Sequence, residues 1–214
     1  MDWQRARKPE QKAIRRREIL DAAHTLFAEL EYEAISLNAI AREAGISKPN
    51  VYRYFSTREE IFLQIFLEVF QAWAESMHDA LMQLQIPASA RQIAESWTAV
   101  IRKHPRLLRL AGLLMTSMER NSSEEGLYTF KKAMHQLLDR VAEDLKRVLP
   151  SMSEKGRRQM LVCSYGLIAG LGPMAYPNEV LTRVMERPEF AGRQPDFDEL
   201  MTHALTALIE QDTR

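Results

Sequence analysis

Apolar residues recur about every 3.6 positions along nearly the whole chain, and no stretch keeps the two-residue alternation of a half-buried strand. The first periodic segment carries Ile19, Ala23 and Phe27 on one face, and the last runs from Phe197 to Ile209. Hydrophobic residues make up 46% of the sequence, enough for a buried core. Because this period places apolar side chains on one side of a helix, it predicts an all-α protein of about nine helices.

Two short helices with a tight turn between them are predicted near the N-terminus. Ser36 can cap the first helix and Ser47 the second. Gly45 supplies a turn residue that accepts positive φ, and Ala41 is a small residue where the two helices cross. These features predict a helix-turn-helix over residues 37–55.

The second helix of this motif leaves polar groups outside its apolar contacts. Hydroxyls, an amide, cations and phenols suit the phosphates and base edges of DNA. The exposed set is Ser47, Lys48, Asn50, Tyr52, Arg53 and Tyr54. A three-helix bundle with an ordinary polar surface would carry similar residues, so the motif by itself leaves that alternative open.

The longer string from Arg16 to Phe62 resembles the DNA-binding head of the tetracycline-repressor family. Its most specific part is Ala44-Gly45-Ile46-Ser47 followed by Tyr52-Arg53-Tyr54-Phe55. The resemblance implies an all-helical dimer. It also implies that a small ligand bound to the C-terminal domain releases the operator DNA.

By the same resemblance, residues 1–58 form a helix-turn-helix DNA-binding domain, and residues 59–214 form a larger helical domain for ligand binding and dimerisation. DNA contacts fall on the motif and on the start of the following helix. The implied contact residues are Ser36, Arg42, Ser47, Lys48, Asn50, Tyr52, Arg53, Tyr54 and Arg58. Arg58 takes the place of a lysine that often contacts phosphate in the family, and a guanidinium can bind phosphate with two N–H groups.

A basic run precedes this region, although the formal net charge of the chain is zero. Against one acid, Glu10, it contains Arg5, Arg7, Lys8, Lys12, Arg15, Arg16 and Arg17. Such a run is often only a solvated helix face. Within the resemblance it gains a role as an arm that follows the adjacent DNA backbone or minor groove.

At Glu31 the sequence departs from the family, which usually has a glycine ending the first helix. A left-handed conformation would cost a glutamate about 1 kcal/mol. The turn after the first helix is therefore expected to be built differently in this chain.

Two further segments, Thr57–Glu60 and Ser122–Glu125, have the spacing of capping boxes. Each is followed by a long apolar periodicity. The helix opened by the first box is expected to belong to both the head and the body of the protein.

For the C-terminal domain, an apolar pocket with a few polar groups is expected. The candidate lining residues are Trp73, Met77, Trp97, Met115, Met118, Tyr128, Met134, His135 and Tyr165. Core packing is the alternative for each of them. The 11 methionines suit an adaptable apolar pocket, so the expected small-molecule effector is lipophilic, and the sequence does not identify it further.

The expected dimer interface combines the helix that contains Gly166 and Gly170 with the last helix, from Phe197 to Ile209. Small residues four positions apart let two helices approach closely. Such a dimer would place its recognition helices about 34 Å apart, one turn of DNA. The predicted partners are therefore a second copy of the chain and a near-palindromic double-stranded operator.

Several classes of function are not expected. The histidines His24, His78, His104, His135 and His203 include no pair four residues apart and have no cysteine partner, so no metal site is expected. The sequence carries no glycine-rich phosphate loop and no nucleophile elbow, so neither a cofactor nor an enzymatic activity is expected.

The predicted location is the cytoplasm, or the nucleoid when the protein is bound to DNA. The N-terminus is charged from the start, and Cys163 has no second cysteine with which to form a disulfide. Residues 160–178 carry no formal charge and approach the length of a membrane span. The prolines at 173 and 177 would break a spanning helix, so no membrane partner is expected.

Three functional hypotheses remain. The first is a ligand-responsive transcriptional regulator, most simply a repressor. The second is a nucleoid-associated or architectural DNA-binding protein on the same fold, without a small-molecule effector. The third is a helical enzyme or partner-binding adaptor, which would have no sequence-specific affinity for DNA.

Overall fold

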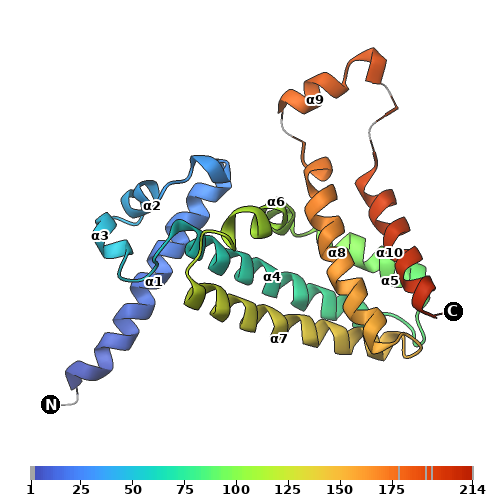
Figure 1. Ribbon diagram of the computed structural model, residues 1–214, viewed down its shortest axis with the longest axis horizontal. Coiled ribbons are helices and arrows are strands. Elements are labelled where there is room, and N and C mark those ends of the chain that lie inside the picture. The colour runs from blue at the N-terminus through green and yellow to red at the C-terminus, as the bar shows by residue number, and fades with distance from the viewer. Residues whose placement is uncertain (1–2, 178, 191, 194, 214) are drawn as a thin grey trace. The chain divides into compact units, whose positions relative to one another are not determined.

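The computed structural model describes residues 3–177, 179–190, 192–193 and 195–213, with side chains from Pro9 onward. Within these residues the chain forms ten α-helices and no strand (Figure 1). The predicted all-α class is confirmed, with one helix more than the number expected from the periodicity.

The helices follow the predicted segments closely. They are α1 (Trp3–Glu29), α2 (Leu37–Glu43), α3 (Lys48–Val51), α4 (Arg58–Met82), α5 (Ala90–Arg102), α6 (Pro105–Leu113), α7 (Glu124–Val148), α8 (Glu154–Ala175), α9 (Glu179–Met185) and α10 (Phe197–Thr213). Single 3₁₀ turns form at Tyr32–Ala34 and Pro188–Phe190, and a π-helical turn at Leu114–Met118 follows α6.

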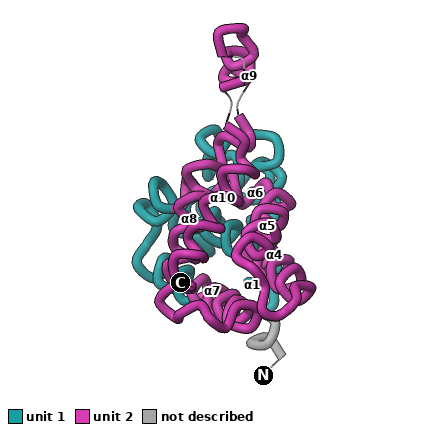
Figure 2. Tube along the Cα trace, turned by 90° about the vertical axis from the view of Figure 1, so that its right-hand side faces the viewer, with its two compact units in different colours: residues 1–68, 115–132 teal, residues 69–114, 133–214 magenta. Residues whose placement is uncertain are grey.

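The chain forms two compact units, which Figure 2 colours separately. The first unit comprises Met1–Glu68 and Met115–Lys132, and the second comprises Val69–Leu114 and Ala133–Arg214. Helices α4 and α7 each contribute residues to both units. The units therefore do not coincide with a single cut after residue 58, and the functional division at that point stays a prediction.

The core of the first unit is built on aromatic and branched side chains from α1 to α4. Ile19 and Ile40 are fully buried. The ring of Phe62 meets that of Phe27 edge-on at 5.6 Å and that of Tyr32 at 4.7 Å between centroids. Burying each such side chain contributes about 1.5–3 kcal/mol, so this cluster fixes α1, α2 and the turn between them against α4.

The turn at Glu31 is built without a left-handed residue, as expected. Glu31 has φ −72° and ψ 151°, which is extended backbone, and the chain then makes the Tyr32–Ala34 turn. Among the described residues, only Gly45 and Gly192 have positive φ. Gly45, at φ 65°, occupies the predicted turn between α2 and α3.

In the second unit, α10 packs against α5 and α8, and α6 packs against α8. The contact of α6 with α8 depends on Gly172, because a Cβ there would lie 3.0 Å from the carbonyl oxygen of Leu108. Trp73 of α4 and Trp97 of α5 fill the middle, with ring centroids 5.3 Å apart. Asp212 of α10 accepts hydrogen bonds from the backbone N–H and the hydroxyl of Ser153, the residue that caps α8.

The apolar segment that approaches the length of a membrane span lies on α8. Among the described helices, none alone is long and apolar enough to cross a membrane. Only α8 and α9 taken together pass on length and composition, and a bend of 72° separates them. Pro173 lies inside α8, which continues to Ala175 and ends before Pro177.

Candidate nucleic-acid interface

The predicted helix-turn-helix forms from α2 and α3, within the first unit. Ile40 and Ala41 of α2 and Val51 of α3 are buried, which holds the two helices together. Ser36 caps α2 as predicted, because its side-chain oxygen accepts a hydrogen bond from the backbone N–H of Ala39 at 3.1 Å. Ser47 occupies the cap position of α3, but its side chain makes no capping hydrogen bond.

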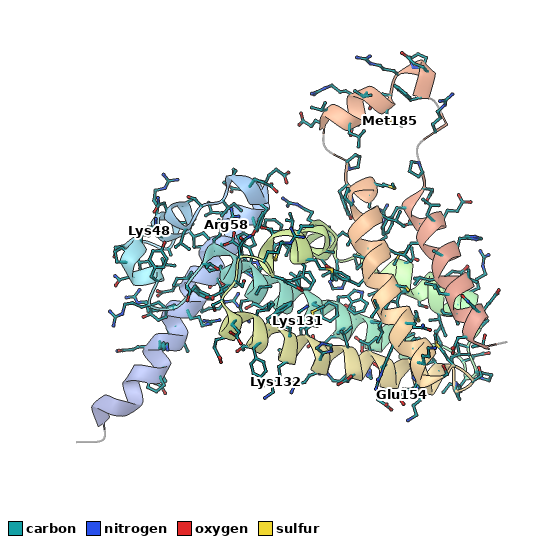
Figure 3. All side chains as sticks on the ribbon, viewed as in Figure 1. Lys48, Arg58, Lys131, Lys132, Glu154 and Met185 are labelled. Atoms are coloured by element: carbon teal, nitrogen blue, oxygen red, sulfur yellow. The ribbon has the colours of Figure 1, made fainter. Side chains whose placement is uncertain are left out.

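Most of the side chains predicted to contact DNA are exposed. Tyr52 is 52% exposed, which is unusual for so large a ring, and the ammonium of Lys48 lies 5.9 Å from its centroid. Figure 3 marks Lys48 on α3. The other exposed members of the predicted set are Ser36, Arg42, Ser47, Asn50 and Arg53, whereas Tyr54 is half-buried.

Arg58 bonds to the protein itself and is only 22% exposed, so the phosphate contact predicted for it has no support in the geometry and stays a prediction. Its Nη1 donates to the carbonyl oxygens of Tyr32, at 3.2 Å, and Ile35, at 2.7 Å. Its Nη2 donates to Glu59 at 2.9 Å, and its guanidinium lies 4.3 Å from the Tyr32 ring centroid. Arg58 is turned inward because two carbonyls and a carboxylate use most of its donors, and it closes the turn between α1 and α2.

Arg16 fixes α1 to the turn between α3 and α4. Its guanidinium lies 4.1 Å from the ring centroid of Phe55, and its Nη1 donates to the carbonyl oxygen of Tyr54 at 3.2 Å. The sequence placed Arg16 in a basic run without separating it from its neighbours. Within that run, the half-buried Arg16 and the exposed Arg17, which pairs with Glu68 of α4 at 3.0 Å, both tie α1 to later parts of the first unit, whereas Arg15 pairs only within α1, with Glu18.

Glu60 takes part in the first predicted capping box and changes the second. The Thr57 hydroxyl accepts from the Glu60 N–H as expected, and the Glu60 carboxylate accepts from the backbone of Thr57 and also from the Ser56 N–H, at 2.7 Å. At the second box, Ser123 caps α7 and Glu125 makes no return bond among the described contacts. Glu60 supplies that bond from α4, since it accepts from the N–H and the hydroxyl of Ser123.

The Glu60 carboxylate thus accepts backbone hydrogen bonds at the starts of both α4 and α7. Burial disfavours the charged form of Glu60, yet the hydrogen bonds from Ser123, Ser56 and Thr57 outweigh it and lower the pKa of the carboxyl. A second link joins the same parts of the chain, since the phenol of Tyr32 lies 3.2 Å from the Ser117 hydroxyl. Residues 115–132 are therefore bonded to the residues that position the helix-turn-helix.

The residues predicted to line a ligand pocket separate into different environments. Trp73, Met77, Trp97 and Met134 are buried in the second unit, and Tyr165 there donates to the Ala111 carbonyl at 2.8 Å. Met118 is buried in the first unit. Met115 and Tyr128 are 58% and 63% exposed, and the exposed His135 lines an open hollow between α7 and α8, so the pocket predicted from these residues stays a prediction.

Comparison with known proteins decides the family. Residues 19–65 match the profile of bacterial regulatory proteins of the tetR family, and residues 67–210 match the profile of the tetracyclin repressor-like C-terminal domain. The second match alone covers more than half of the chain. The chain belongs to the tetracycline-repressor family. Its members are transcriptional regulators that contain a helix-turn-helix.

Sequence relatives of this tetracycline-repressor family member match only part of its length. An HTH-type transcriptional regulator of Mycobacterium tuberculosis is 45% identical over 60 residues, 28% of this chain and 28% of that protein. The fatty acid metabolism regulator protein of Bacillus subtilis is 32% identical over 98 residues, 46% of this chain and 47% of that protein. The matched segments span less than half the length of either relative.

Solved structures of the family match over almost the whole length. The fatty acid degradation regulator FadR from Bacillus halodurans has a TM-score of 0.57 and 15% identity, covering 91% of this chain and 94% of that one. A TetR transcriptional regulator from Rhodococcus sp. RHA1 has a TM-score of 0.56 and 16% identity, covering 94% and 97%. At these identities the likeness establishes the shared fold.

Proposed function

We propose that the protein is a ligand-responsive transcriptional repressor that binds a near-palindromic operator as a homodimer. The observation that carries this proposal is the exposed surface of α3, where Lys48, Asn50 and Tyr52 stand outside a buried apolar contact. A cation, an amide and a phenol on a short helix match the groups that read phosphates and base edges in the major groove.

An apolar face on α8 and α10 supports the homodimer. Val162 of α8 is 72% exposed, and Cβ atoms added at Gly166 and Gly170 would find nothing within 4 Å. The neighbouring α10 exposes Leu200 and Ala207. Exposed apolar side chains on neighbouring helices, with room for close approach, are typical of a helix-helix interface between subunits.

The buried tryptophans of the second unit support a small-molecule effector. Within the described part of the chain, the indole N–H groups of Trp73 and Trp97 are buried and have no hydrogen-bond partner. A buried donor left without an acceptor costs about 1–3 kcal/mol. A lipophilic molecule with an acceptor group would relieve that cost. Relatives named for fatty acid metabolism and degradation favour the same lipophilic class.

Selection of duplexes from random DNA by the purified protein, followed by fluorescence anisotropy, tests the DNA-binding proposal. The enriched sequence should contain two half-sites about one helical turn apart. Replacing Lys48 or Tyr52 by alanine should weaken binding by about 1–3 kcal/mol, whereas Lys155→Ala on α8 should not. A pool without any enriched sequence, together with no binding at low salt, would refute the proposal.

The homodimer and the effector need separate tests. Val162→Glu should shift the sedimenting species from dimer to monomer, and Tyr128→Glu, a comparably exposed position, should leave the dimer intact. In a thermal-shift screen, a lipophilic effector should raise the melting temperature and lower the affinity for the selected duplex. If every ligand that stabilises the protein leaves DNA affinity unchanged, the ligand-responsive part fails.

A further inference from the structure

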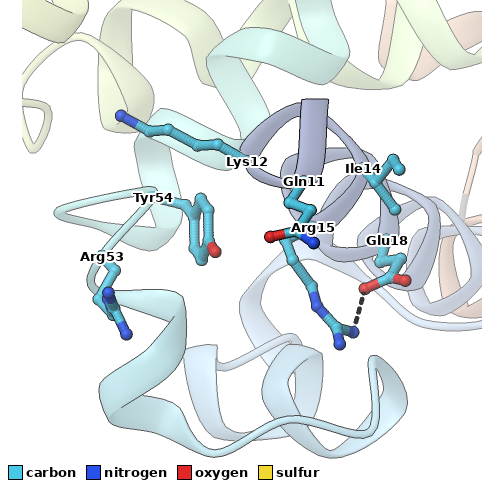
Figure 4. A pocket seen from close by; sticks show the side chains of 7 residues that line it. All are labelled: Gln11, Lys12, Ile14, Arg15, Glu18, Arg53 and Tyr54. Atoms are coloured by element: carbon cyan, nitrogen blue, oxygen red, sulfur yellow. Dashed lines mark hydrogen bonds and ion pairs between the residues drawn. The ribbon is translucent and has the colours of Figure 1, made fainter. Parts of the chain in front are cut away.

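A hollow of about 670 Å³ opens between α7 and α8, wholly within the second unit. Figure 3 marks Glu154, which lines it at the start of α8. A different hollow, in the first unit, is lined by Arg53 and Tyr54, which the proposed function already assigns to DNA (Figure 4). No predicted DNA contact lines the hollow between α7 and α8, so the proposed function leaves it without a role.

Most of the charged side chains around this hollow already have a partner. Glu143 pairs with Lys146 on α7, and Glu154 pairs with Arg158 on α8. In the described contacts, two further charged side chains of the lining have no counter-ion and do not pair with each other. They are Asp139 of α7 and Arg157 of α8. The hollow therefore presents one unpaired cation and one unpaired anion, each from a different helix.

Arg157 is a buried group, which makes the missing counter-ion unusual. The residue is only 8% exposed, and its Nη1 donates to the carbonyl oxygen of Met152. No described contact uses its Nε or Nη2. Neither atom is among the fully buried polar atoms without a partner, which in the described chain are only two indole nitrogens. The unused N–H groups of Arg157 are thus accessible from the hollow, and a buried charge is normally paired.

The other lining groups restrict what can pair with Arg157. A simple anion would meet the unpaired carboxylate of Asp139 in the same hollow and be repelled by it. A molecule that carries both charges satisfies both side chains, and its carboxylate can accept two parallel N–H bonds from a guanidinium. The half-buried Leu138 and the buried Leu161 add apolar surface. The volume lies in the range of small-molecule sites, about 300–1,000 Å³.

We infer that this hollow binds a small zwitterion with an apolar side chain, the chemistry of a free apolar amino acid or of a short apolar peptide. Its carboxylate pairs with Arg157, its ammonium group pairs with Asp139, and its apolar group lies against Leu138 and Leu161. This ligand class differs from the lipophilic effector proposed for the buried tryptophans. The inference also stands apart from DNA binding, because no residue of the hollow belongs to the predicted DNA contacts.

Calorimetry on the full-length protein with matched probes tests the two charges separately. L-leucine carries both charges, isocaproate lacks the ammonium group, and isoamylamine lacks the carboxylate. L-leucine should bind saturably, and each analogue should bind about tenfold more weakly, because one charged contact is lost. Isocaproate binding as tightly as L-leucine would overturn the zwitterion.

The dipeptide leucyl-leucine distinguishes the two sources of the same chemistry. Tighter binding of the dipeptide would support the inference with a peptide as the ligand, and tighter binding of L-leucine would support it with a free amino acid. Absence of saturable binding for both would overturn the inference.

Asp139→Asn removes one charge from the exposed side of the hollow. It should weaken L-leucine about tenfold, to the level of isocaproate, and should not weaken isocaproate. The matched control is Asp79→Asn on α4, an exposed aspartate outside this hollow, which should change neither affinity. An unchanged affinity for L-leucine in Asp139→Asn would overturn the inference.

Arg157→Gln should abolish binding of both L-leucine and isocaproate. Because Arg157 is buried, the melting curve of this variant is recorded first, and Asp139→Asn decides the question if Arg157→Gln does not fold. Asp139→Asn should also sediment as the wild type does. Dissociation of a wild-type dimer by Asp139→Asn would overturn the inference, because a second copy of the chain would then supply the missing charges.

Discussion

The first unit and the second unit differ in how their buried polar groups are used. In the first, Glu60 and Arg58 are half-buried, and each bonds to several backbone groups. In the second, Asp212 and Tyr165 also bond to other helices, but the indole N–H groups of Trp73 and Trp97 are buried without an acceptor in the described structure. The second unit thus keeps two buried donors unused at its core, next to apolar packing.

This difference fits the functions proposed for the two units, DNA binding for the first and ligand response for the second. A surface that reads DNA must keep its side chains at fixed spacing, and satisfied polar contacts restrict such a unit to one geometry. A unit that responds to a ligand benefits from groups whose bonding improves when the ligand arrives, because a ligand shifts an equilibrium only by its differential affinity.

Truncating Trp97 should have the largest effect on stability. Trp97→Ala should lower the free energy of unfolding by about 3–5 kcal/mol, since it empties a buried site. Trp97→Phe keeps an aromatic ring and removes the unpartnered N–H, so it should cost only about 1 kcal/mol. Urea unfolding measures both. A Trp97→Phe variant as unstable as Trp97→Ala would mean that the indole N–H has a partner. The contrast between the bonded polar groups of the first unit and the unused donors of the second would then fail.

Replacing Glu60 should have the next largest effect on the free energy of unfolding. Glu60→Ala deletes bonds at the first turns of α4 and α7, and should cost about 2–3 kcal/mol from two caps. Glu125→Ala, in the predicted second box, should cost almost nothing because that side chain is exposed. The two unfolding curves are compared in urea. Equal losses of unfolding free energy in the two variants would mean that Glu125 does close a local capping box at Ser122–Glu125.

Replacing Arg58 should have a smaller effect on stability. The variant distinguishes a structural role of this side chain from a role in DNA binding. Arg58→Lys keeps the charge but loses the multiple bonds to Tyr32, Ile35 and Glu59, and should cost about 1–2 kcal/mol in unfolding free energy. The salt slope of DNA binding should stay unchanged. A slope reduced by about one unit with unaltered stability would mean that Arg58 binds a phosphate after all.

The smallest expected effect is on acid stability. The pKa of Glu60 is lower in the folded protein than in the unfolded chain, so its contribution is present above the unfolded value and is lost as pH falls through the folded one. The stability difference between the wild type and Glu60→Ala should therefore shrink below about pH 4. A difference that does not vary with pH would show that the charge of Glu60 is not what matters.

Local signals in the sequence predicted most of the fold. Helix periods, Ser36 and Gly45 are short-range features, and each lies where it was expected. The role of Glu60 could not be found this way, because its second set of bonds joins residues 63 positions apart. The structural role of Arg58 was missed for the same reason, since its acceptors lie 23 and 26 residues earlier in the chain.

The candidate pocket was harder to predict than the helix-turn-helix. Tryptophan and methionine at helical spacing fill cores and line pockets equally well, so the sequence could not separate the buried Met77 from the exposed Met115. The exposed surface of α3 was easier, because a motif fixes which positions face inward.

The bonds that Glu60 makes at the starts of two helices restrict which residues relatives of this protein can carry at position 126. A Cβ at position 126 would lie 3.0 Å from Oε1 of Glu60 and 3.1 Å from its Cγ and Cδ, so a larger residue there would push the Glu60 side chain from its present position. In relatives that keep a glutamate at position 60, a glycine should persist at position 126. Where one of the two positions changes, the other should change with it, so the pair is expected to be inherited together.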